Sequence, residues 1–180
     1  MNILSFNIVA SPETNDHQVR ILVDGKDLLG DDYLGLDPPR LFEQENLFRQ
    51  GKLLIGRCTC GCEGCGDNWV TVDIDHDSVC WSDLSLKFEK TAYFENVKLV
   101  MNDHSWEDKN RCAERLVSEI FQGRKTKSDY SFTWASARVK ENVITLSFNK
   151  ADEQKLFEFN WDGQLPENAQ LAAKEFIKNF

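Results

Sequence analysis

The sequence is short of the residues that most enzyme and membrane motifs need. It has only three histidines and four prolines, and no apolar run approaches the length of a membrane span. It also lacks a Gly-x-Ser-x-Gly nucleophile elbow, a phosphate-binding Gly-x-x-x-x-Gly-Lys-Ser/Thr loop and a His-Glu-x-x-His zinc motif. These absences favour a non-catalytic protein that is not embedded in a membrane.

Basic residues are also scarce relative to acidic ones. Lys and Arg number 21 against 30 Asp and Glu, so the formal net charge is -9. Nucleic-acid binding depends on clustered Lys and Arg, and we therefore expect no nucleic-acid partner. Residues 1–9 lack the basic start and unbroken apolar core of a secretion signal. We expect a cytoplasmic protein whose acidic surface either binds a basic partner or serves solubility.

Length and residue patterning predict one α+β domain. The 180 residues, with 12 Phe and 5 Trp, are enough to bury a core. Neither a linker composition nor a repeat divides the chain, so 1–180 is expected to be a single domain. Alternating apolar residues predict mostly antiparallel sheet, built from hairpins and meanders. The predicted strands are 3–9, 18–23, 53–58, 69–75, 79–81, 92–100, 130–139, 142–149 and 154–161.

Two amphipathic helices are expected to pack on this sheet. Ser105 precedes an acidic residue at the spacing of a capping box, and apolar residues then recur at helical spacing. This pattern predicts a helix over about 106–121. Pro166 can begin a second helix over about 166–179, since proline is favoured in the first helical turn. A shorter helix is expected over roughly 39–49.

The most distinctive feature is a cysteine-rich stretch at residues 58–65, called here the cysteine turn. It holds four of the six cysteines, which is not the spacing of a secreted disulfide framework. Thiolates on a Gly-rich turn can converge on a soft cation such as zinc. Because four ligands in so short a stretch can hardly enclose a tetrahedral ion, a partner from outside the turn is expected. The candidate ligands are Cys58, Cys60, Cys62, Cys65, Cys80 and His76, with Cys112 as a more distant thiol.

Two other interpretations of the cysteine turn stay open. In one, Gly61, Gly64 and Gly66 supply positive φ to a tight hairpin, and the small thiols only pack beneath it. In the other, Cys62 and Cys65 form a Cys-x-x-Cys redox pair, although the βαβ setting typical of such pairs is missing.

The cysteine turn lies within a wider motif, Arg-Cys-x-Cys-Gly-x-x-Gly-Cys, at residues 57–65. In this motif and the hairpin that it feeds, the chain resembles a scattered group of small uncharacterised bacterial proteins. The resemblance implies that Cys58, Cys60 and Cys65 are the shared cysteines, whereas Cys62 is peculiar to this chain. Small acidic bacterial proteins of this type often resemble immunity partners of secreted toxins. By analogy, the resemblance implies an immunity-like role for this chain.

Two functional hypotheses follow. The first is a non-catalytic, immunity- or antitoxin-like binding protein that neutralises a basic toxin through an acidic surface. The second is a zinc-binding protein or a small metal-dependent enzyme centred on the cysteine turn.

Overall fold

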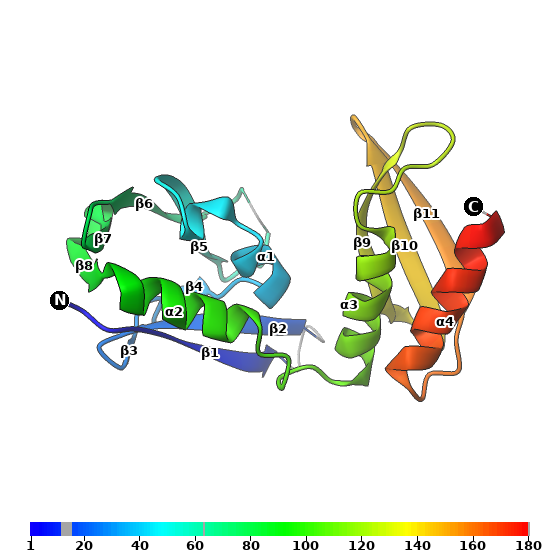
Figure 1. Cartoon of the computed structure of the whole chain (residues 1–180), viewed down its shortest axis with the longest axis horizontal. Coiled ribbons are helices and arrows are strands. Elements are labelled where there is room, and N and C mark those ends of the chain that lie inside the picture. The colour runs from blue at the N-terminus through cyan, green and yellow to red at the C-terminus, as the bar shows by residue number, and fades with distance from the viewer. Residues whose placement is uncertain (12–15, 63, 180) are drawn as a thin grey trace. The chain divides into compact units, whose positions relative to one another are not determined.

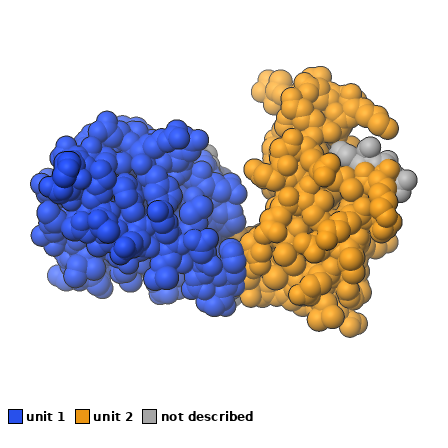
Figure 2. All heavy atoms as spheres, in the orientation of Figure 1, with its two compact units in different colours: residues 1–106 blue, residues 107–180 orange. Residues whose placement is uncertain are grey.

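The chain folds into two compact units with separate hydrophobic cores. The computed structural model describes residues 1–11, 16–62 and 64–179. Unit 1 comprises Met1–Trp106 and unit 2 comprises Glu107–Phe180, and Figure 2 colours them separately. Each unit packs its own cluster of buried apolar side chains. The sequence carries no linker composition between the two units, and the single domain expected over 1–180 stays a prediction.

Unit 1 is built mainly from two antiparallel sheets. Their strand orders are β1-β2-β3 and β4-β5-β6-β7-β8. The strand bounds are β1 Leu4–Ser11, β2 Asp16–Val23, β3 Lys26–Asp27, β4 Tyr33–Leu34, β5 Gly51–Cys58, β6 Asn68–Ile74, β7 Ser78–Trp81 and β8 Leu86–Glu89.

Two isolated β-bridges connect these sheets. Val19 in β2 pairs with Leu36, just after β4, and Asn2, just before β1, pairs with Phe88 in β8. The backbone N–H of Asn2 also donates to the carbonyl of Lys87 at 2.7 Å. Backbone pairing therefore runs from β1 through both sheets to β8, and from β8 back to the residue just before β1. The two sheets enclose the core of unit 1 between them.

Helix α2, Lys90–Met101, packs against β1, β7 and β8 (Figure 1). The prediction of a strand over 92–100 is therefore wrong. Tyr93 and Val97 are its buried residues and stand four positions apart, which is helical spacing. The Glu89 carboxylate accepts two backbone N–H bonds and caps the start of the helix.

The helix expected over 39–49 is shorter than predicted. The structure has α1, Pro38–Phe42, followed by a 3₁₀ turn, η1, at Glu45–Leu47. A second 3₁₀ turn, η2 at Ser82–Leu84, separates β7 from β8. Residues 12–15, in the connection between the first two predicted strands, lie outside the described residues.

Unit 2 is a three-stranded antiparallel meander with both helices on one face (Figure 1). The strands follow the predicted order, and tight turns at residues 141–142 and 151–152 connect them as expected. The first helix begins a little later than predicted, because Asp108 rather than Ser105 accepts the capping hydrogen bond. The elements are α3 Lys109–Phe121, β9 Ser131–Lys140, β10 Val143–Lys150, β11 Glu153–Asn160, α4 Pro166–Phe176 and η3 Ile177–Asn179.

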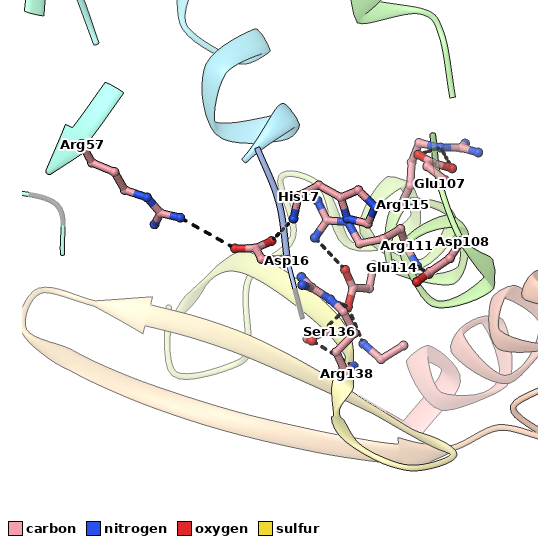
Figure 3. Close-up of polar contacts among 11 residues, drawn as sticks. Asp16, His17, Arg57, Glu107, Asp108, Arg111, Glu114, Arg115, Ser136 and Arg138 are labelled. Atoms are coloured by element: carbon pink, nitrogen blue, oxygen red, sulfur yellow. Dashed lines mark hydrogen bonds and ion pairs between the residues drawn. The ribbon is translucent and has the colours of Figure 1, made fainter. Parts of the chain in front are cut away.

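A buried carboxylate ties α3 to β9 in unit 2 (Figure 3). Oε1 of Glu114 accepts hydrogen bonds from Ser136 Oγ at 3.0 Å, the Ala137 N–H at 2.8 Å and Arg138 Nε at 2.8 Å. Oε2 accepts from Arg111 Nη1 at 3.1 Å. The three donors from β9, Ser136, Ala137 and Arg138, lie where the register of β9 against β10 shifts, so the carboxylate holds an irregular segment of strand against the helix.

The predicted α+β fold with mostly antiparallel sheet is confirmed. Among the described helices, none is both long enough and apolar enough to cross a membrane.

Candidate metal centre

The cysteine turn connects β5 to β6, as the sequence predicts for a hairpin. The base of this hairpin is fixed, because Leu53, Leu54 and Ile55 of β5 are fully buried and pack into the core of unit 1. Cys58 is the last residue of β5, whereas Cys60, Cys62 and Cys65 are exposed beyond it. A rigid hairpin thus presents a solvent-facing loop that carries four thiols.

Glycine geometry shapes this loop. The N–H of Gly61 donates to the carbonyl of Cys58 at 3.0 Å, which closes a four-residue turn over 58–61. Gly61 and Gly64 have φ of 78° and 83°, values that glycine adopts without steric cost. A Cβ at Gly66 would lie 3.2 Å from Cys58 Cβ, so the returning strand passes close to the first cysteine. The expected positive φ holds at two of the three glycines.

Arg57 supports the turn from the preceding position. Its Nη1 donates to the carbonyl of Gly61 at 3.1 Å, and its Nη2 lies 3.9 Å from Asp16 Oδ2 in β2 (Figure 3). The guanidinium therefore connects the cysteine turn to the neighbouring sheet. Sequence reasoning included Arg57 only as a motif residue and missed Asp16. The sequence offers no signal for this long-range ion pair.

Three of the predicted ligands come together. The sulfur atoms of Cys58, Cys60 and Cys65 all lie within 4.8 Å of one another, and those of Cys58 and Cys60 are 2.6 Å apart. Two thiolates on one tetrahedral zinc ion lie about 3.8 Å apart, given zinc–sulfur bonds of about 2.3 Å. Small rotations of the side chains thus bring all three sulfurs to bonding distance of a single ion.

Cys62 lies in the same turn but outside this group. Its Sγ is 3.9 Å from the carbonyl oxygen of Cys60. In the described part of the chain, the metal-competent group in this turn consists of Cys58, Cys60 and Cys65. These are the three cysteines that the motif resemblance implies.

The sheet register places Cys80 and His76 at the other end of the hairpin. Cys80 pairs with Asp73 of β6, beside Val72, and Val72 pairs with Gly51 at the start of β5. The cysteine turn begins where β5 ends, about 23 Å away for a strand of this length at about 3.3 Å per residue. His76 follows the same end of β6 and contacts its neighbour, with Nδ1 2.5 Å from Asp77 Oδ1.

The remaining cysteine, Cys112, lies on α3 in unit 2. Its Sγ is 3.7 Å from Nη2 of Arg115. Burial and the nearby Glu107 carboxylate raise the pKa of this thiol, which makes it a poor thiolate donor at neutral pH.

Within the group of three clustered cysteines, Cys60 and Cys65 have very different pKa values. Hydrogen bonding from Cys58, assisted by the backbone N–H of Cys62, lowers the pKa of Cys60 to about 7. Hydrogen bonding with Cys60 raises the pKa of Cys65 to about 11. In the metal-free chain, Cys60 therefore ionises before Cys65, and the Cys65 thiol donates a hydrogen bond to the Cys60 thiolate. Because a metal binds thiolates, its binding would displace the remaining protons.

Comparisons with protein-family models, curated proteins and solved structures find no match for this chain. The resemblance to small bacterial proteins therefore stays a prediction.

Proposed function

We propose that the protein binds one soft metal ion, zinc, through the thiolates of Cys58, Cys60 and Cys65. The observation that carries this proposal is the convergence of three sulfur atoms within 4.8 Å at the tip of a rigid hairpin. Thiolates are the ligands that zinc and other soft ions prefer. A cluster formed only by packing would gain most by burying its thiols, but two of these three are exposed.

The arrangement favours metal binding over metal-assisted catalysis. Three protein ligands leave one coordination position of a tetrahedral ion for water or an outside ligand. A catalytic site would also need a positioned base. His76, the histidine closest to the turn in sequence, lies at the opposite end of the hairpin. The proposed role is therefore to hold an ion at the surface of unit 1.

Elemental analysis of protein purified without chelator tests the proposal. We expect about one zinc per chain, as one three-thiolate site implies, and its loss in Cys60→Ser. Cys80→Ser is the matched control, because it removes a thiol from the same sheet far from the turn. Cys62→Ser removes a thiol from the turn itself and should also retain zinc. Metal-free wild-type protein, or equal loss in Cys80→Ser, would contradict the proposal, and loss in Cys62→Ser would contradict the three-ligand set.

A second candidate is the acidic binding protein of the immunity type. The distribution of charge favours it: unit 1 has 18 acidic and 9 basic residues, whereas unit 2 has 12 of each. The whole net charge of -9 therefore belongs to unit 1. Such a field attracts and steers a basic protein partner, for example a toxin.

Affinity capture from the native host tests this second candidate. The captured protein should be basic, and its association rate should fall steeply as the salt concentration rises. Capture of no basic protein, or association that is insensitive to salt, would count against it.

A further inference from the structure

One close pair of sulfur atoms in the cysteine turn points to a second chemistry. Cys58 Sγ and Cys60 Sγ are 2.6 Å apart, and the turn closed by the Gly61 N–H holds both residues on one loop. We infer that a hydroperoxide oxidises Cys60, that Cys58 then closes a Cys58–Cys60 disulfide, and that this releases the metal. The release step rests on the proposed function, whereas the disulfide does not.

The reaction proceeds in two balanced steps. The Cys60 thiolate attacks one oxygen of the hydroperoxide; a sulfur–oxygen bond forms and the oxygen–oxygen bond breaks. The leaving oxygen takes a proton and departs as water or an alcohol. The Cys58 thiolate then attacks the sulfenic sulfur of Cys60, the sulfur–sulfur bond forms, and hydroxide leaves and is protonated to water. Two thiols together lose two electrons, and the hydroperoxide gains them.

Position in the loop selects this pair. Cys60 is exposed and therefore accessible to a small oxidant, whereas Cys58 is half-buried beside it and suited to the resolving role. The alternative Cys62-x-x-Cys65 pair is less favoured, because Cys62 lies outside the group of three sulfurs. Cys80 lies at the far end of the hairpin and cannot compete.

Closing the disulfide would demand little of the rest of unit 1. A disulfide bond is about 2.05 Å long, so the two sulfurs need to approach by only about half an ångström. The buried residues of β5 lie before Cys58 and need not move. The disulfide would remove two of the three thiolates from the metal. An exposed bond of this kind is readily reduced, so the site can be restored by thiols.

Peptide mapping of the zinc-loaded full chain tests the inference. The protein is treated with hydrogen peroxide, zinc release is followed with a chromogenic chelator, and free thiols are alkylated. Trypsin gives the fragment 58–87, and cleavage after Glu63 separates Cys65 from the other cysteines of the turn. We expect fragment 58–63 to hold an internal disulfide and an alkylated Cys62, with the disulfide and free zinc appearing at the same rate.

Three controls sharpen the result. Cys80→Ser should behave as wild type, and dithiothreitol should restore zinc binding. In metal-free Cys58→Ser, peroxide should leave Cys60 as a sulfenic acid that dimedone labels. Recovery of Cys58 and Cys60 as alkylated residues after zinc release, or a disulfide to Cys62 or Cys65, would overturn the inference.

The same mapping on metal-free chain separates the two proposals. A chain that takes up no zinc but forms the Cys58–Cys60 disulfide would contradict the proposed function and support the disulfide. A chain that binds zinc but keeps the thiols of Cys58 and Cys60 reduced under peroxide would support the proposed function and contradict the disulfide.

Discussion

Replacing Glu114 by alanine should destabilise unit 2 strongly. The side chains of Glu114 and Arg111 are only 8% and 5% exposed, and the carboxylate accepts four hydrogen bonds from four different residues. Removing one partner of a buried ion pair typically costs about 3–5 kcal/mol, because the other charge remains buried. We expect a loss of that size in the free energy of unfolding of unit 2.

Glu119→Ala is the matched control on the same helix. Glu119 also pairs with an arginine, Arg115, at 3.0 Å, but its side chain is 56% exposed. Water and salt screen such a pair, and it contributes about 1 kcal/mol or less. The two variants remove the same chemical group from α3, so the difference between them measures what the buried hydrogen-bond network of Glu114 adds beyond an exposed ion pair.

Native-state hydrogen exchange with peptide resolution is the appropriate assay, because each unit can then be followed separately. A loss of about 3–5 kcal/mol should speed exchange of the protected amides of α3 and β9 by about two to four orders of magnitude. Unit 1 should be unaffected. Similar acceleration in Glu114→Ala and Glu119→Ala, or none in either, would refute the claim that the buried network stabilises unit 2.

Three further predictions concern unit 1. In metal-free protein, the rate of iodoacetamide labelling should reach half its maximum near pH 7 at Cys60, whose pKa is about 7, because the thiolate fraction rises with pH. At Cys65, whose pKa is about 11, it should do so only near pH 11. Equal pH profiles at the two residues in residue-resolved mass spectrometry would contradict this prediction. Gly35→Ala should lower the free energy of unfolding in urea by about 1–3 kcal/mol, since its Cβ would lie 2.1 Å from the carbonyl oxygen of Val19. An unchanged free energy of unfolding would show that the backbone at Gly35 moves away from Val19 without cost. Zinc at about 100 times its Kd should stabilise unit 1 by about 2.7 kcal/mol and leave unit 2 unchanged; hydrogen exchange that a chelator does not alter in unit 1 would argue against binding there.

The sequence predicts best the elements whose partners are close along the chain. The three strands of unit 2 follow one another through two tight turns, in which Asn142 and Ala151 adopt positive φ. The β5–β6 hairpin and its cysteine turn are likewise local. In such cases alternation and turn residues carry most of the information.

What depends on distant contacts could not be predicted. Residues 92–100 contain enough β-branched and aromatic residues to resemble a strand, whereas capping by Glu89 and burial of Tyr93 and Val97 against other elements favour a helix. Cys80 looks like a ligand from its position near the turn in sequence. Its distance from the turn follows from the register of three strands, which a single sequence does not specify.

The way in which unit 1 closes on itself also bears on how it folds. Asn2 bonds to Lys87, and the Asn96 side chain donates to the carbonyl of Leu4 at 2.9 Å. These contacts join residues almost a whole unit apart, so the first strand stays without its last neighbours until α2 has been synthesised. Contacts so distant in sequence slow folding, whereas the meander of unit 2 forms from neighbours. During synthesis the slower-folding unit leaves the ribosome first, and its first strand then has β2 but not yet β8 and α2 as neighbours.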